Sequence, residues 1–250
     1  MNASPIVLKT ERYGFAVVPD ILPEADRLGL IAFAESLEAR AEAHRRGAEK
    51  AVHAMRHLLG EDIVRRAAVA HPVREIVEDV LGPGARAVRA ILFDKVPGAN
   101  WTVPYHQDVT LAVKAKPDPA PEGFGPWSVK DGVVHVEAPV AFLERMLTIR
   151  LHLDGCGEDN GALRVLPGSH RAGRLRDRDV PVWRTRTQER ACPVGAGGAI
   201  AMRPLLLHAS SPALTPTHRR VLHLEYAAAD LPPGLEWAES LCLTESPNHV

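Results

Sequence analysis

In the stretch Met146-Leu147-Thr148-Ile149-Arg150-Leu151-His152-Leu153-Asp154, apolar and polar residues alternate without interruption from Leu147 onward. Because successive side chains of a strand point to opposite faces, its leucines and isoleucine would share one face and its polar residues the other. The pattern therefore predicts a strand whose apolar face packs on a core. Its polar face would line either an interior site or the solvent side of a half-exposed strand.

Similar segments follow one another between residues 84 and 226. Ala87–Phe93 and Arg219–Tyr226 are typical strands, and loops separate them. There is no regular alternation of strands with helices, which argues against a parallel doubly wound sheet. The long succession of strands predicts a mainly β jelly roll.

The first 84 residues differ from the rest because they are rich in helix-forming residues. After a short opening strand at 13–18, we expect helices at 24–49, 51–59, 61–70 and 72–81. The chain is then a single domain over 1–250. A mostly helical part, 1–84, packs outside a jelly-roll core, 85–230.

Composition restricts the setting of the protein. The 250 residues are 46% hydrophobic and 24% charged, with a net charge of −1, as in ordinary globular domains. This balance gives no general attraction to nucleic acid or to anionic membranes, and no apolar run is long enough for a membrane span. The three cysteines are far apart and form neither a disulfide framework nor a paired zinc motif. We expect a cytoplasmic protein that binds a small molecule, with no nucleic-acid or membrane partner.

A candidate metal site begins in Val103-Pro104-Tyr105-His106-Gln107-Asp108. On a strand, His106 and Asp108 point the same way, so an imidazole nitrogen and a carboxylate oxygen could share one divalent ion. His208 is the candidate third ligand. Two histidines and one carboxylate on one face of a metal are typical of non-haem iron(II) oxygenases.

Two further groups are of interest beside these residues. Arg219 would begin the last strand, where it either holds a carboxylate by paired hydrogen bonds or forms a surface salt bridge. The Ser210 hydroxyl could add a hydrogen bond to the same carboxylate. His170 follows the tight turn at 167–169, and we interpret it as a loop or capping residue rather than a metal ligand.

The chain resembles the phytanoyl-CoA dioxygenase family between about Tyr13 and Tyr226. The resemblance rests on a combination of motifs: His106-Gln107-Asp108, Asn160-Gly161-Ala162-Leu163, Pro167-Gly168-Ser169-His170, and His208-x-Ser210 with Arg219. Members of this family are iron(II)- and 2-oxoglutarate-dependent oxygenases on a double-stranded β-helix, the cupin-like jelly roll.

The resemblance implies a role for each motif. His106, Asp108 and His208 would bind iron(II), and Arg219 with Ser210 would bind the far carboxylate of 2-oxoglutarate. The polar face with Arg150 and Thr148 would lie beside the cosubstrate. Dioxygen would then be used to hydroxylate a small molecule at an unactivated C–H bond. The retained Asp108 favours hydroxylation over halogenation, because a small residue there would open a site for halide.

Two other functions remain compatible with these residues. One is a cupin-like isomerase or lyase that uses a divalent metal without 2-oxoglutarate. The other is a catalytically silent small-molecule binding protein on the same scaffold. Arg219 argues against the first, because only the oxygenase needs a carboxylate anchor there. The complete ligand set argues against the second.

The segment from Lys114 to Pro139 is too long for a simple turn and follows directly on the metal motif. We interpret it as a substrate lid, the alternative being an inert surface excursion. The candidate substrate contacts are three residues of this segment and one of the 146–154 strand: Trp127, Lys130, His135 and His152.

Overall fold

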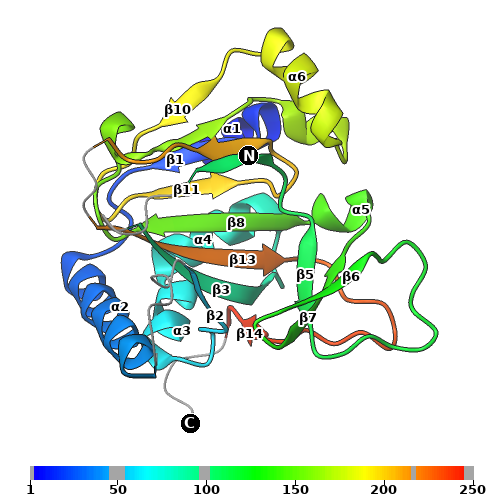
Figure 1. The fold of residues 1–250 in the computed structure, drawn as a ribbon, viewed down its shortest axis with the longest axis horizontal. Coiled ribbons are helices and arrows are strands. Elements are labelled where there is room, and N and C mark those ends of the chain that lie inside the picture. Colours follow the sequence, from blue (N-terminus) through cyan, green and yellow to red (C-terminus); the bar gives the residue numbers. More distant parts are fainter. Residues whose placement is uncertain (1–2, 45–53, 96–101, 215–217, 245–250) are drawn as a thin grey trace.

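The computed structural model describes residues 3–44, 54–95, 102–214 and 218–244 (Figure 1). Two antiparallel sheets face each other as a jelly roll without closing into a barrel, and a small third sheet stands at one end. The large sheet has the order β1-β11-β8-β13-β3-β14, with β2 also paired to β3. Its strands are β1 (Phe15–Val18), β2 (Ala54–Arg56), β3 (Arg86–Lys95), β8 (Met146–His152), β11 (Ala199–Met202), β13 (Arg219–Ala227) and β14 (Leu241–Cys242).

The smaller facing sheet has the order β10-β9-β12-β4, and the third sheet the order β5-β7-β6. The strands of the facing sheet are β4 (Val103–His106), β9 (Leu163–Val165), β10 (Arg190–Cys192) and β12 (His208–Ser210). Those of the third sheet are β5 (Thr110–Val113), β6 (Trp127–Lys130) and β7 (Val133–Glu137).

Helices cover the outer face of the large sheet (Figure 1). These helices are α1 (Pro5–Tyr13), α2 (Glu24–His44), α3 (Asp62–Val69) and α4 (His71–Leu81). Two more, α5 (Val140–Leu143) beside the third sheet and α6 (Val180–Arg186) near β10, lie outside this layer, and there are short 3-10 turns η1 (Glu158–Asn160), η2 (Ser169–Ala172) and η3 (Asp177–Asp179). No helix in the described ranges combines the length and apolarity needed to cross a bilayer.

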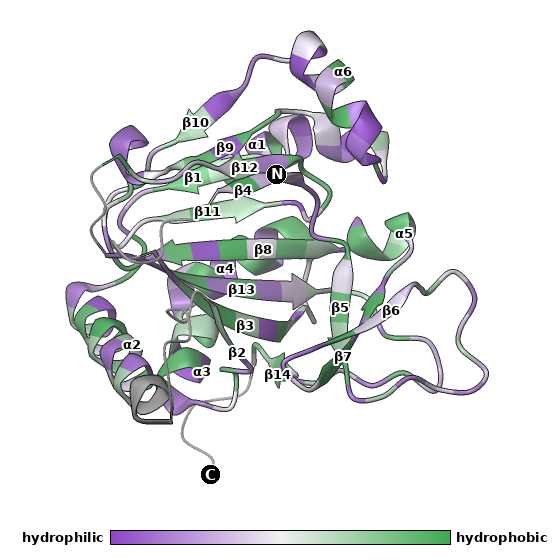
Figure 2. Ribbon diagram, in the orientation of Figure 1, coloured by the Kyte–Doolittle hydropathy of each residue, from purple (hydrophilic) through white to green (hydrophobic). Residues whose placement is uncertain are grey.

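The alternation predicted for β8 is confirmed. Leu147, Ile149 and Leu151 are fully buried in one cluster with Leu30 of α2 and Val64 of α3. The apolar stripes of the helices meet this face of the sheet (Figure 2). Burying such side chains contributes about 1.5–3 kcal/mol each. The polar residues of β8 are thereby directed to the opposite face, toward the smaller sheet.

A second apolar cluster lies between the two sheets. Ile200 and Met202 of β11 pack with Leu163 and Val165 of β9, and all four are buried. This seam holds the sheets together at one side. The remaining space between them is lined by polar as well as apolar groups, and it contains the candidate site.

Several predicted elements differ from the structure. The helix predicted at 51–59 is wrong, because Ala54–Arg56 forms β2 and pairs with β3; residues 51–53 lie outside the described ranges. Strand pairing here overrides the helix propensity of the alanines. Helix α1 was not predicted, although Ser4 caps it by accepting a hydrogen bond from the Val7 N–H. The segment 114–139 is not a plain loop, because it contains β6 and β7.

Candidate metal centre

The two candidate histidine ligands are brought together by strand pairing. β4 and β12 are antiparallel neighbours, and their register places His208 opposite His106. The two imidazole centroids are 4.2 Å apart. Asp108 follows two residues after the end of β4, and its backbone N–H donates to Pro204 O at 2.9 Å. That bond places the Asp108 side chain beside both rings.

The ligand atoms of His106, Asp108 and His208 all lie within 4.8 Å of one another. Asp108 Oδ1 is 3.7 Å from His106 Nε2, and Asp108 Oδ2 is 3.6 Å from His208 Nε2. One divalent ion between them could contact all three groups. The three predicted metal ligands therefore form one cluster in the structure.

The protonation of the two imidazoles suits metal binding. His106 Nδ1 lies 2.9 Å from Pro104 O, and His208 Nδ1 lies 2.9 Å from Leu206 O. A carbonyl oxygen only accepts hydrogen bonds, so each Nδ1 carries the hydrogen and each Nε2 presents its lone pair. Such outer hydrogen bonds orient histidine ligands at metal sites.

Asp108 supplies independent evidence that a cation belongs here. Its Oδ2 atom is buried and has no hydrogen-bond partner among the described residues. A buried carboxylate oxygen without a partner is costly unless a cation compensates it. The ligand types, their orientation and this unsatisfied oxygen fit a divalent ion with open coordination positions.

The charges of the centre are those that a metal requires. Burial would raise the pKa of Asp108, but His208, His223, His106 and Arg89 together hold this pKa well below its usual range. Burial lowers the pKa of His208 to about 3, against the opposing effect of Asp108. At neutral pH the carboxylate is therefore ionised and the His208 imidazole is neutral.

The residue between the first two ligands has a structural role. Gln107 points away from the metal side, and its Nε2 donates to Leu205 O at 2.6 Å and to Gly173 O at 2.9 Å. Its Oε1 accepts from Leu175 N at 2.8 Å. Gln107 therefore ties the strand that carries His106 to the segment that precedes His208.

Ser169 supports the third ligand from beneath. It is completely buried, and its Oγ accepts a 2.8 Å hydrogen bond from the backbone N–H of Leu207, the residue before His208. The next residue, His170, lies outside the metal cluster with its Nε2 3.2 Å from Glu11 O. The turn at 167–170 thus braces β12.

Replacing Ser169 by alanine should weaken metal binding without touching a ligand. The buried Leu207 N–H would lose its partner, at a cost of about 1–3 kcal/mol. We expect a lower melting temperature and a several-fold weaker metal affinity, measured by thermal unfolding and metal titration. Ser128→Ala, on an exposed position of β6, is the matched control. Equal metal affinity in the two variants would show that Ser169 does not support His208.

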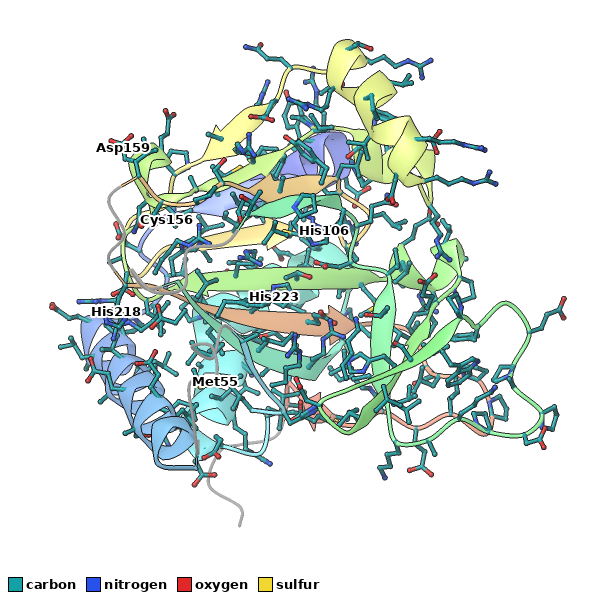
Figure 3. The ribbon with its side chains drawn as sticks, in the orientation of Figure 1. Met55, His106, Cys156, Asp159, His218 and His223 are labelled. Carbon is teal, nitrogen blue, oxygen red and sulfur yellow. The ribbon has the colours of Figure 1, made fainter. Side chains whose placement is uncertain are left out.

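The metal cluster forms part of the wall of a cavity between the two sheets. The cavity is lined by Arg89, Ile91, Phe93, Val103, His106, Asp108, Arg150, Leu163, His208, Ala209, Ser210, Arg219, Val221 and His223. In Figure 3, His106 and His223 lie in the middle of the molecule, and His218 lies at the end near α2. Both predicted carboxylate-binding residues, Arg219 and Ser210, are therefore in the same cavity as the metal ligands.

Arg219 is held by the backbone of the turn at 160–161. Its Nη1 donates to Gly161 O and to Asn160 O, while its Nε is buried and has no hydrogen-bond partner among the residues described. Gly161 has φ +66°, and a Cβ there would meet Ser211 O at 2.6 Å and Arg219 Nη1 at 2.9 Å. Only glycine leaves room for the guanidinium in this position.

The neighbouring arginine faces the other way, as the alternation predicts. Arg220 Nε and Nη2 each lie 2.9 Å from an oxygen of Asp154, and Nη1 lies 3.1 Å from Glu35 Oε1. Arg220 therefore joins β13 to the outer helix α2, and takes no part in the cavity.

A second group of possible metal ligands lies outside the cavity, at the start of β13. It consists of Glu38, Asp94 and His218. Here protein donors already serve the carboxylate: Asp94 Oδ2 is 2.8 Å from His218 Nδ1, and Oδ1 accepts from Arg219 N at 3.2 Å. This group anchors the first residue of β13. Both Asp94 oxygens have protein partners, whereas Asp108 Oδ2 has none among the described residues.

The remaining predicted contacts lie away from the cavity wall. Thr148 and His152 are buried between the sheets. Within the described ranges, the Thr148 hydroxyl and both ring nitrogens of His152 have no hydrogen-bond partner. Burial, and then Arg150, lower the pKa of His152 to about 3, so this ring is neutral. Trp127 packs in the core of the third sheet, Lys130 is exposed, and His135 is buried with Nδ1 3.0 Å from Val133 O.

Sequence reasoning did not assign roles to Arg89, Phe93 and His223, which also line the cavity. The signal that would have found His223 was present, because it shares the inner face of β13 with Arg219. Arg89 and Phe93 lie on β3, whose alternation is blurred by alanines and by buried residues on both faces. Their position follows from the pairing of β3 with β13.

A jelly roll whose neighbouring strands β4 and β12 bring two histidines and a carboxylate together, with an arginine in the same cavity, is typical of mononuclear non-haem metal enzymes. The sequence model described as phytanoyl-CoA dioxygenase (PhyH) matches residues 10–221. The chain belongs to this family, whose members are iron- and 2-oxoglutarate-dependent oxygenases. No curated protein matches the chain.

Solved structures share the fold at low sequence identity. The epimerase SnoN from nogalamycin biosynthesis has a TM-score of 0.64 and 20% identity, covering 92% of this chain and 89% of SnoN. The carbocyclase SnoK from the same pathway has a TM-score of 0.68 and 18% identity, covering 92% and 85%. EctD from S. alaskensis has a TM-score of 0.68 and 20% identity, covering 91% and 79%. SnoN has been crystallised with Fe3+ and alpha ketoglutarate, and EctD with 2-oxoglutarate and 5-hydroxyectoine.

Proposed function

We propose that this protein is an iron(II)- and 2-oxoglutarate-dependent dioxygenase that hydroxylates a small molecule at an unactivated C–H bond. The observation that carries the proposal is the position of Asp108. Its carboxylate lies 3.7 Å from His106 Nε2 and 3.6 Å from His208 Nε2, and its Oδ2 has no hydrogen-bond partner among the described residues. Arg219 lines the same cavity. A site of this kind can hold a metal and a dicarboxylate side by side.

Each residue then has a separate task. His106, Asp108 and His208 hold the iron, and Arg219 with Ser210 takes the far carboxylate of 2-oxoglutarate. When bound, iron supplies the redox chemistry that couples the decarboxylation of 2-oxoglutarate by dioxygen, giving succinate and carbon dioxide, to substrate oxidation. The apolar walls, Ile91, Phe93, Leu163 and Val221, exclude water from this chemistry.

Hydroxylation is favoured over halogenation by the ligand set. Asp108 occupies the position that a halide would need. The chain's structural neighbours include an epimerase and a carbocyclase, so the fold alone permits other oxidations. The crystallised complex of EctD with 2-oxoglutarate and 5-hydroxyectoine supports the hydroxylase reaction. An isomerase or lyase without 2-oxoglutarate would not need a guanidinium in this cavity.

The proposal is tested by reconstituting the protein with iron(II) and measuring succinate formed from 2-oxoglutarate. We expect slow succinate formation without substrate and faster formation when a suitable metabolite from a screened panel is present. The stimulating metabolite should gain one oxygen atom, which isotopically labelled dioxygen would supply. An iron-loaded protein that forms no succinate, with or without the panel, would contradict the proposal.

We further propose that the third sheet covers the Arg89 end of the cavity during substrate binding. Arg89 Nη1 donates to Thr110 O of β5 at 3.1 Å, and Asp131, in the β6–β7 turn, lies 2.5 Å from Arg56 of β2. These contacts connect the third sheet to the large sheet on either side of that end.

Replacing residues 117–131 by a short glycine–serine linker should separate substrate-coupled from uncoupled turnover. Residues of this segment pack in the core of the third sheet, so thermal stability should fall as well. We expect substrate-stimulated succinate formation to be lost, while iron affinity and slow uncoupled decarboxylation are retained. A double variant, Lys130→Ala with Asp131→Ala, tests the cover without removing the core. Normal hydroxylation of the substrate by the folded linker variant would exclude a covering role.

A further inference from the structure

A continuous chain of polar contacts crosses the inner face of the large sheet. Arg89 Nη2 lies 2.7 Å from Glu225 Oε1, Glu225 Oε1 lies 3.2 Å from His223 Nε2, and His223 Nδ1 lies 2.9 Å from Arg150 Nη1. The four residues come from three neighbouring strands, because Glu225 is in register with Arg89 and His223 with Arg150. Nothing in the proposed iron and cosubstrate binding uses this chain.

The direction of the hydrogen bonds follows from the donors. A guanidinium only donates, so His223 Nδ1 must accept from Arg150, and the hydrogen of the ring lies on Nε2 and is donated to Glu225. His223 is therefore neutral. The negative charge of Glu225 is paired with Arg89. Within the described ranges, no carboxylate forms an ion pair with Arg150.

Arg150 is held with one edge of its guanidinium available. His223 takes Nη1, and the Arg150 Cζ lies 5.7 Å from the Phe93 ring centroid. The Nε atom is buried and has no hydrogen-bond partner in the part of the chain that the structure describes. The side of the group formed by Nε and Nη2 is the edge that binds a planar carboxylate through two parallel hydrogen bonds.

The charges of the proposed complex leave Arg150 uncompensated. Bound iron(II) carries two positive charges and 2-oxoglutarate two negative ones. Arg89 is paired with Glu225, so Asp108 alone supplies negative charge against the two guanidinium groups of Arg219 and Arg150, and one positive charge is left over. Arg150 then remains as a cation in the wall of the same cavity. Burial of a guanidinium without a counter-ion is unfavourable, because its hydration is lost without an ion pair in return. The net charge of the groups in the cavity is therefore balanced only when another anion enters it.

We propose, on the basis of the proposed function, that Arg150 recognises a carboxylate of the primary substrate, so that the substrate is a small organic acid. His223 is the positioning residue that turns the guanidinium, and Glu225 and Arg89 keep His223 in the required tautomer. Arg150 is accordingly assigned to the substrate rather than to 2-oxoglutarate. The apolar walls of the cavity accommodate the rest of the acid.

The test uses matched probes that differ only in charge: benzoate and benzamide, hexanoate and hexanamide, cyclohexanecarboxylate and its amide. Their binding to the protein loaded with iron(II) and 2-oxoglutarate is measured by calorimetry without dioxygen. We expect wild type to bind at least one acid about tenfold more tightly than its amide, as one charge-assisted pair allows. Arg150→Met should abolish this preference while changing 2-oxoglutarate affinity less than about threefold, and Arg150→Lys should restore it only in part.

Thermal unfolding separates recognition from a structural role. Arg150→Met removes an uncompensated charge and should leave the melting temperature unchanged or higher. Arg89→Met is the matched control. It leaves Glu225 without its counter-ion and should lower the melting temperature by several degrees. A purely structural Arg150 would show a loss similar to that of the Arg89 variant, and this result would overturn the proposal.

The remaining outcomes are also decisive. A preference for the acid in no probe pair, or a preference that survives Arg150→Met, would overturn the proposal. If Arg150→Met lowers 2-oxoglutarate affinity as much as Arg219→Ala does, Arg150 binds the cosubstrate and not the primary substrate. Failure of the proposed function would be recognised separately, because the wild-type protein would then bind neither iron nor 2-oxoglutarate. In that case the binding of the acid and amide probes is measured on metal-free protein. If the preference for the acid is lost in Arg150→Met and kept in Arg219→Ala, the result supports recognition of the acid by Arg150.

Discussion

Asp108→Ala should abolish turnover and lower iron affinity. The loss of affinity should exceed the roughly 10- to 100-fold loss that is usual when a residue that only orients a metal ligand is removed. The substitution removes the negatively charged ligand and leaves two neutral imidazoles, His106 and His208. His106→Ala and His208→Ala should also eliminate activity, because each leaves only two protein ligands. Iron content after dialysis and succinate formation from 2-oxoglutarate measure the two effects.

The control for this series is Asp79→Ala, which removes an exposed carboxylate from α4. It should retain wild-type iron content and activity. All variants should remain folded, and Asp108→Ala should be at least as stable as the metal-free wild type, because it removes an unsatisfied buried oxygen. If all three ligand variants kept wild-type iron affinity and activity, the metal assignment would be wrong.

The strands that carry the site could be predicted because their patterns are local. The alternation of β8 and β13 is visible in a few residues, and it correctly separates Arg219 from Arg220. The helices α3 and α4 were predicted to within one residue at each end. For β2 the local signal was misleading, because three residues in an alanine-rich stretch pair with the edge of β3. Pairing with a strand more than 30 residues away leaves no local trace.

The supporting contacts of the site could not be read from spacing. Ser169 reaches Leu207 across 38 positions, and Gln107 reaches Leu205 across 98. The contact of Arg150 with His223 spans 73 positions and depends on the register of two strands. The sequence contains candidates for these roles, but only the packing of the sheets selects among them. The metal ligands were predictable because their chemistry restricts the residue types.

Arg219→Ala should weaken 2-oxoglutarate binding by roughly 30-fold or more while leaving iron affinity nearly unchanged. Losing a buried charge-assisted pair costs on the order of 2–5 kcal/mol. In the described ranges, the Arg219 side chain forms hydrogen bonds to Asn160 O and Gly161 O and none to a metal ligand. Calorimetric titration of 2-oxoglutarate into iron-loaded protein without dioxygen measures the loss directly.

Arg220→Ala is a demanding control, because it removes the same group from the next residue of the same strand. Its guanidinium binds Asp154 and Glu35 on the outer side, so the variant should be less stable but should bind 2-oxoglutarate with wild-type affinity. A general disturbance of β13 would weaken binding in both variants. Loss of binding in Arg219→Ala alone would locate the carboxylate on the inner face. If Arg219→Ala keeps wild-type affinity for 2-oxoglutarate, the far carboxylate is bound by Arg150 instead. Arg150 is the other arginine of the cavity whose guanidinium has no carboxylate partner in the described ranges. The cavity would then hold its dicarboxylate across β8 instead of β13.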